Sequence, residues 1–215
     1  YRLYALSNLA SMLALLGYPV LVEPWWAVDV QAHGWSLGYG VFVVLCLATA
    51  VVVWRTASGH AQSNPEALPD ALHPGWRECL LWIGLSAAPS VLLLALTRHL
   101  TQDVAPVPFL WVLPLAIYLL SFILCFDAPR YYVRPFFVAL FPVALFAMDR
   151  VLDGGMDVFP LTVVICLCLF VFCMVCHGEL VRRKPPLRHL TLFYLLLSVG
   201  GALGGFLVAL VAPAV

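Results

Sequence analysis

The sequence predicts an all-α integral membrane protein, a helical bundle with about seven transmembrane helices. First, 64% of the 215 residues are hydrophobic and only 10% are charged, whereas soluble proteins carry about 25% charged residues. Second, apolar stretches of about 20 residues, the length that crosses a bilayer, recur along the whole chain. Third, Trp and Tyr residues lie near the ends of these stretches, where interfacial rings are enriched.

The expected spans follow one another through short connections. The first ends at Glu23-Pro24, and Pro89, Pro114 and Pro142 lie inside the third, fourth and fifth. An internal proline removes a backbone donor and tends to kink a helix. Transporters use such breaks to build binding sites, but proline is also common in membrane helices, so both interpretations stay open. The spans are 3–22, 36–54, 79–97, 107–126, 134–152, 158–178 and 190–212.

These spans leave little chain for a soluble domain. We therefore expect a single transmembrane domain over residues 1–215. The polar, proline-containing stretch near 55–78 predicts a mobile cytoplasmic loop. Both ends look cut, since the chain begins at Tyr1-Arg2 and ends at Ala214-Val215, and we expect a fragment of a longer protein.

The distribution of Lys and Arg predicts the orientation of the bundle. Eight of the eleven lie in the loops between spans 2 and 3, 4 and 5, and 6 and 7, whereas Arg2, Arg98 and Arg150 lie on the opposite side. Because cytoplasmic loops carry an excess of Lys and Arg, those three loops are expected to be cytoplasmic. The formal net charge of zero argues against a nucleic-acid partner.

The most specific motif is Cys173-Met174-Val175-Cys176-His177, which contains the C-x-x-C-H pattern of c-type haem attachment. The motif ends the sixth span and precedes the basic stretch at Arg182. Covalent haem at Cys173, Cys176 and His177 would require the outer, oxidising side, whereas the charge pattern predicts the cytoplasmic side. We therefore expect no cofactor. His177 and Glu179 are predicted to be structural residues at the cytoplasmic interface, with a gate or docking site as the alternative.

Glycines in the seventh span form two overlapping G-x-x-x-G pairs, Gly200 with Gly204 and Gly201 with Gly205. Such pairs let another helix approach closely, so close packing is expected, with a substrate path as the alternative. Spans 1 and 7 also share a layout. Tyr4 and Tyr194 lie 190 residues apart, and Pro24 and Pro213 lie 189 apart, which is a weak indication of a repeated six-helix unit.

Few other polar groups are expected at membrane depth, where such groups are functional candidates. Asn8 in the first span could join helices by hydrogen bonding. His99 and Asp103 would share a face if the third span continues as a helix. A solvated turn is one interpretation of this pair, and a proton or cation site is the alternative. The sequence contains no Walker or H-E-x-x-H motif, so it favours no enzymatic activity for this chain.

Several stretches together resemble the membrane region of bacterial fused transporter/spermidine synthase-like proteins. They are Leu3–Ser11 with Tyr18-Pro19 and Glu23-Pro24, Val104–Leu115, Cys176–Leu180, and Phe193-Tyr194 with Gly200–Gly205 and Ala212-Pro213. The resemblance implies that any synthase chemistry lies in a soluble domain outside this chain. It also implies a bacterial inner-membrane location and makes His177-Gly178-Glu179 a feature of the membrane region.

The sequence-based hypothesis is therefore a multi-pass bacterial inner-membrane module of a spermidine-synthase-like fused protein. Its expected role is transport, anchoring or assembly, and its expected partners are the lipid bilayer and either other membrane subunits or a soluble synthase-like domain. Two alternatives remain. One is an accessory subunit of a larger membrane complex, including one that carries haem or pigment. The other is a secondary transporter of small cations or metabolites, with a water-filled cavity at the kinked centres of spans 3 to 5.

Overall fold

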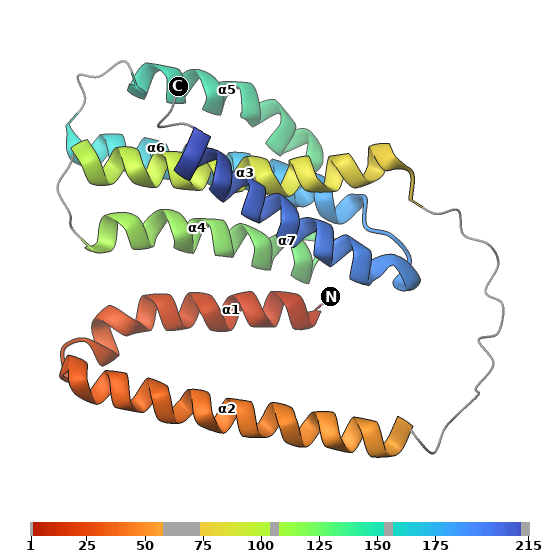
Figure 1. Ribbon diagram of the computed structural model, residues 1–215. Helices are drawn as coiled ribbons and strands as arrows, with labels where there is room; N and C mark the ends of the chain where they lie inside the picture. Colours follow the sequence, from red (N-terminus) through yellow and green to blue (C-terminus); the bar gives the residue numbers. More distant parts are fainter. Residues whose placement is uncertain (1, 58–73, 104–107, 153–156, 212–215) are drawn as a thin grey trace. The chain divides into compact units, whose positions relative to one another are not determined.

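The computed structural model describes residues 2–57, 74–103, 108–152 and 157–211, and no strand occurs within these ranges (Figure 1). The prediction of an all-α architecture is confirmed for this part of the chain. The α-helices are α1 (Arg2–Gly17), α2 (Val28–Ala57), α3 (Trp76–Asp103), α4 (Pro108–Asp127), α5 (Arg134–Leu152), α6 (Val158–Arg182) and α7 (Leu190–Phe206). The short helices are η1 (Tyr18–Val22), η2 (Pro129–Tyr131), η3 (Leu187–His189) and η4 (Leu207–Val211).

Six helical segments among the described residues are long and apolar enough to cross a membrane. The protein is therefore membrane-embedded, as the composition predicts. The six segments are Ala5–Val22, Val28–Thr56, Trp76–Thr101, Leu110–Asp127, Val158–Arg182 and Leu187–Val211.

The predicted count of seven spans is not confirmed, because α5 is not among these six. This helix has 19 residues. Arg134 is its first residue, and Asp149 and Arg150 lie near its end. The uncharged run 135–148 between them is shorter than the roughly 20 residues that a perpendicular span needs. A helix forms where the sequence predicts one, and its role as a seventh span stays a prediction.

Several helices extend beyond the predicted spans. α2 begins at Val28 instead of 36, α3 runs on to Asp103, and α6 runs on to Arg182. The spans are predicted from hydropathy, so they end where the apolar residues end. The helices are longer because their backbone hydrogen bonds continue through the polar residues at the interface. The expected mobile loop near 55–78 lies mainly in 58–73, outside the described residues.

The chain divides into two compact units, residues 17–73 and residues 1–16 with 74–215. In the first unit, α2 is exposed over the whole of its apolar segment, as expected of a helix that contacts lipid. The single transmembrane domain over residues 1–215 stays a prediction.

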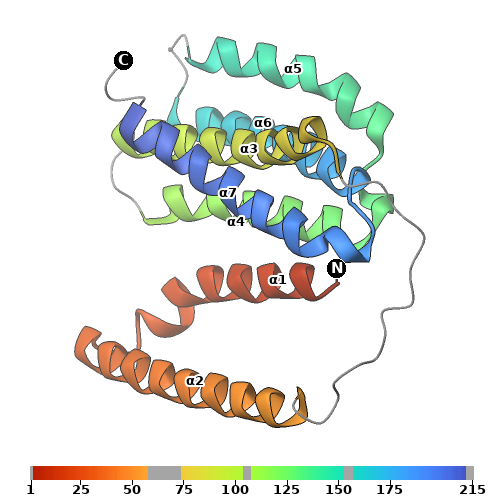
Figure 2. The ribbon, with the colours of Figure 1, turned by 45° about the vertical axis from the view of Figure 1, so that its right-hand side comes forward.

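In the second unit, α3, α4, α6 and α7 lie side by side, and α5 packs along α6 (Figure 2). Two core clusters mark the two ends of this bundle. One contains Trp82, Phe122, Met174 and Phe193. The other contains the ends of α3 and α5 and the first half of α6, through residues such as Leu100, Val151 and Ile165. The end of α6, the start of α3 and the start of α5 therefore lie at the same end of the bundle.

The glycines of α7 differ in what they face. A Cβ at Gly200 would overlap the Ser86 hydroxyl and lie 2.5 Å from the Ile83 carbonyl, and a Cβ at Gly204 would lie 2.7 Å from the Ala87 carbonyl of α3. Gly201 and Gly205 leave room for a Cβ at ordinary contact distances. Gly200 and Gly204 thus form the close contact with α3.

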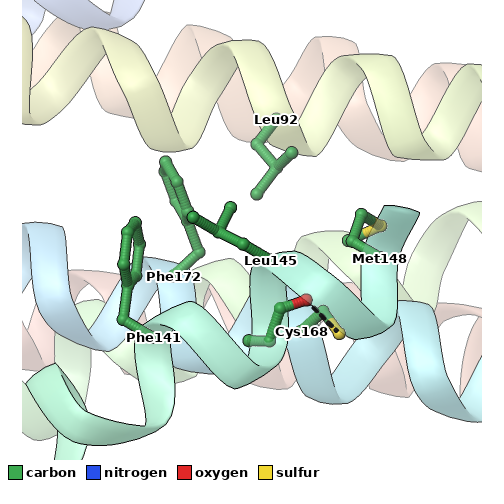
Figure 3. Close-up of a pocket in the computed structure, with 7 residues that line it drawn as sticks. Leu92, Phe141, Leu145, Met148, Cys168 and Phe172 are labelled. Atoms are coloured by element: carbon green, nitrogen blue, oxygen red, sulfur yellow. Dashed lines mark hydrogen bonds between the residues drawn. The ribbon is translucent and has the colours of Figure 1, made fainter. Parts of the chain in front are cut away.

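A small apolar cavity of about 40 Å³ lies between α3, α5 and α6 (Figure 3). Leu92, Phe141, Leu145, Met148 and Phe172 line it, together with Ala144, whose carbonyl accepts a hydrogen bond from the Cys168 thiol. Its lining offers no charged group to a cation or a polar metabolite.

Candidate functional site

The candidate site lies on the last two turns of α6, in the stretch that contains His177, Gly178 and Glu179. α6 packs against α3, α4 and α5, so most of its circumference is covered by protein. The helix continues beyond the predicted limit at 178 because Leu180 and Val181 are apolar and extend the packed face. His177 therefore lies inside the bundle instead of at its surface.

His177 is completely buried, with 0% of its surface exposed. Its ring stacks on Phe122 at a centroid distance of 3.8 Å and an interplanar angle of 30°. Tyr118 meets the same ring edge-on at 5.2 Å. Both aromatic residues come from α4 and lie four positions apart, so one face of α4 forms the slot that holds the imidazole.

The hydrogen-bond partners of Ser121 indicate which tautomer of His177 is present. The Ser121 hydroxyl donates its proton to the Tyr118 carbonyl at 2.7 Å. Its oxygen is then free to accept, and the Nδ1–H of His177 donates to it at 2.9 Å. The proton of the neutral imidazole is thus on Nδ1, which leaves Nε2 as an acceptor. Nε2 has no hydrogen-bond partner among the described residues.

A second hydrogen bond links α3 to α4 one turn away. The Ser90 hydroxyl donates to the Ser86 carbonyl at 3.1 Å, so the Tyr118 hydroxyl donates to Ser90 Oγ, at 3.4 Å. Pro89 and Pro114 lie on the same two helices, fully buried. Polar groups at the centre of the bundle are therefore joined in short chains across α3, α4 and α6.

Gly178 is required where Tyr132 crosses α6. A Cβ at this position would overlap the Tyr132 ring. The ring in turn stacks on Phe137 at 5.7 Å. The absence of a side chain at position 178 thus lets the segment between α4 and α5 lie directly on α6.

Glu179 connects three segments at the end of the bundle. Its Oε1 accepts hydrogen bonds from the Tyr132 hydroxyl at 3.1 Å and from Arg134 Nε at 2.8 Å, and Arg182 Nη1 lies 4.0 Å away. Burial, and then the adjacent Glu179 carboxylate, raise the pKa of the Tyr132 phenol. The phenol therefore remains a donor to Glu179 at neutral pH.

Trp82 fixes the start of α3 to the same end. Its indole Nε1 donates to the Arg183 carbonyl at 3.0 Å, which satisfies one of the free carbonyls at the end of α6. The ring packs edge-on against Phe193 of α7 at 5.2 Å. The Trp82 contacts and the Glu179 contacts together connect α3, α5, α6 and α7 at this end of the bundle.

The cysteines of the C-x-x-C-H motif are inside the packed bundle. Cys173 is 0% and Cys176 is 6% exposed, and all seven cysteines are free thiols. Haem attachment requires thiols that can reach a vinyl group beside an accessible imidazole, and the Phe122 ring covers one face of His177. Within the described residues, no three His, Cys, Asp or Glu side chains are grouped for a metal ion. The expectation of no cofactor stays a prediction.

The other predicted residues lie elsewhere. Asn8 is a half-buried residue of α1. His99 is half-buried near the end of α3, next to Leu100, and therefore lies at the end of the bundle opposite Glu179. α3 continues as a helix to Asp103, but the side chain of Asp103 lies outside the described residues. The structure joins His177 to Ser121 and Glu179 to Tyr132 and Arg134, partners that the sequence analysis did not assign.

Comparisons with known proteins provide no assignment: no protein-family model, curated protein or solved structure matches this sequence.

Proposed function

We propose that this chain is the multi-pass membrane module of a bacterial fused transporter/spermidine synthase-like protein, and that it anchors and assembles a soluble synthase-like domain at the inner membrane. The resemblance that suggests this family includes Cys176–Leu180. The observation that carries the proposal is the concentration of interhelical hydrogen bonds at this stretch.

The geometry favours anchoring for a physical reason. A docking surface is most effective when its groups are already fixed, because association then costs less conformational entropy. Glu179 holds Tyr132 and Arg134, and Trp82 holds Arg183, at one end of the bundle. The connections after α4 and α6 thus start from fixed positions, on the side that the charge pattern predicts to be cytoplasmic.

The first experiment is to read the complete coding sequence that contains these 215 residues. We expect a spermidine-synthase-like domain in the same protein. The membrane module and that domain are then expressed as separate chains. The soluble chain should sediment with membranes that contain the wild-type module and be released by Glu179→Ala, whereas Asp29→Asn in α2 serves as the control. A complete gene without such a domain would contradict the proposal. A soluble chain that does not sediment with membranes containing the wild-type module would also contradict it.

A second candidate function is a secondary transporter of small cations or metabolites. The favouring observation is a set of polar groups between α3, α4 and α6, namely Ser90, Tyr118 and the acceptor Nε2 of His177. Proteoliposomes test this candidate. Transport that depends on His177 should be lost in His177→Phe and retained in His99→Phe, and an equal effect of both substitutions would contradict a role for His177.

A further inference from the structure

A pocket of about 260 Å³ lies at the end of the bundle that Glu179 organises. Its lining comes from three segments and consists of Cys125, Tyr132, Gly178, Val181 and Arg182. The segment of α6 that is long and apolar enough to cross a membrane ends at Arg182. The pocket therefore lies at the depth where the phospholipid head groups meet the acyl chains.

The pocket combines an apolar wall with a cationic rim. Cys125, the Tyr132 ring and Val181 form the wall, and Arg182 forms part of the rim. The segments on either side, 127–134 and 179–188, contain six Lys and Arg residues against two acidic residues, Asp127 and Glu179. An anion at the rim would therefore meet a net positive field.

Arg182 at this rim, and Arg134, which contacts the same Glu179 carboxylate, retain donors for a ligand. Arg134 uses Nε for Glu179, and Arg182 approaches the same carboxylate only to 4.0 Å. A guanidinium carries five N–H donors in a planar fork, a geometry that suits phosphate. Both side chains are more than half exposed, so their remaining donors can turn toward the pocket without loss of the Glu179 contacts.

We propose that this pocket binds the head group of an anionic phospholipid. The phosphate meets Arg182 and Arg134, and the glycerol and first acyl carbons lie against Val181 and Tyr132. The volume is smaller than that of typical pockets for whole ligands, which begin at about 300 Å³, and accommodates only this part of a lipid. Basic pockets between membrane helices recognise anionic head groups in this way. The proposal needs only a membrane-embedded protein and does not rest on the proposed anchoring function.

Native mass spectrometry of the detergent-purified protein, with added phosphatidylglycerol or phosphatidylcholine, tests the proposal. We expect preferential retention of phosphatidylglycerol. Arg182→Gln should weaken it about fivefold, the effect of one basic residue near a charged membrane surface. Val181→Trp should weaken it without a change of charge, because the indole fills the pocket. Arg150→Gln, which removes a positive charge from the end of α5, is the matched control and should leave retention unchanged.

Melting temperatures with inorganic phosphate, phosphatidylglycerol or phosphatidylcholine distinguish a lipid site from a phosphate site and confirm that each variant is folded. A rise with phosphatidylglycerol alone supports the proposal. Three results would overturn it: equal retention of the two lipids, an equal rise with inorganic phosphate, or an equal loss in Arg150→Gln and Arg182→Gln. The last result would indicate a diffuse charge effect instead of a pocket.

Discussion

At the residue scale, the imidazole of His177 is held by one hydrogen bond and two aromatic contacts. Ser121 accepts from Nδ1, Phe122 stacks on the ring, and Tyr118 meets its edge. Because Nε2 has no partner among the described residues, only Nδ1 contributes a hydrogen bond here. The ring therefore acts mainly as a flat aromatic group that carries one donor.

This arrangement predicts that Ser121→Ala is more harmful than the loss of both polar partners. Ser121→Ala strands the buried Nδ1–H and should cost about 1–3 kcal/mol. The double variant Ser121→Ala/His177→Phe removes donor and acceptor together and keeps the stacked ring. It should recover part of the stability, which a double-mutant cycle of thermal unfolding in detergent measures. Additive losses in the two single variants would show that the two side chains do not interact.

Gly178 gives a second prediction at this scale. Gly178→Ala places a methyl group in the Tyr132 ring and should lower the stability by roughly 1–3 kcal/mol, the usual cost of overpacking. The matched control is Gly205→Ala, whose Cβ would lie 3.8 Å from Leu94 Cδ1. The control should be neutral or stabilising, because alanine favours helix over glycine by up to about 1 kcal/mol. Equal melting temperatures for both variants would contradict the required close approach at 178.

The sequence predicts the membrane spans, but it does not predict the partners of His177 and Gly178. Hydropathy and length predict spans because they decide by themselves whether a helix can cross a bilayer. They cannot say which side chains meet between helices, since that depends on how the helices pack. One signal for the slot was available: Pro114, Tyr118 and Ser121 follow one another at spacings of four and three, which places them on one helix face. His177 was singled out for a motif, whereas its burial comes from the packing of α4 on α6.

At the element scale, the contact between α3 and α7 depends on two of the four glycines in α7. Gly200→Leu would force the leucine into Ser86 and the Ile83 carbonyl, and it should separate the two helices. Gly201→Leu adds the same side chain one residue away, where a Cβ has ordinary contact distances. We expect a clear loss of thermal stability for the first variant and a small change for the second. Similar losses in both variants would show that the helix contact is not specific to the Gly200 face.

The ends of α1 and α7 share a structural feature, in addition to the tyrosine and proline spacing that the two spans share in the sequence. Each helix passes into a five-residue π-helix, Tyr18–Val22 after α1 and Leu207–Val211 after α7. These segments are 189 residues apart, the same separation as Pro24 and Pro213. π-Helical turns are rare and frequently occur at functional sites. Their shared position adds a structural feature to the two sequence matches that suggested a repeated unit.

At the scale of the whole molecule, the contacts of Glu179 and Trp82 place the connections after α4 and α6 at one end of the bundle. Because both connections lie at one end, α4 and α6 run toward that end, and α5 and α7 run away from it. Which end faces the cytoplasm follows only from the distribution of Lys and Arg, which favours the end that carries Arg134 and Arg182. The two statements are independent and can be tested in one experiment.

Single cysteines introduced into a Cys46→Ser/Cys79→Ser background, which leaves only the five buried native thiols, should report the topology through a membrane-impermeant maleimide. Val133→Cys and Leu187→Cys lie at the Glu179 end, and both native residues are exposed. Asp157→Cys lies at the start of α6, at the other end. In intact cells we expect labelling of Asp157→Cys alone, with the other two labelled only after membrane disruption. If Val133→Cys and Leu187→Cys label on different sides, the arrangement of the helices is wrong. If both label from outside and Asp157→Cys does not, the arrangement holds and the orientation predicted from charge is wrong.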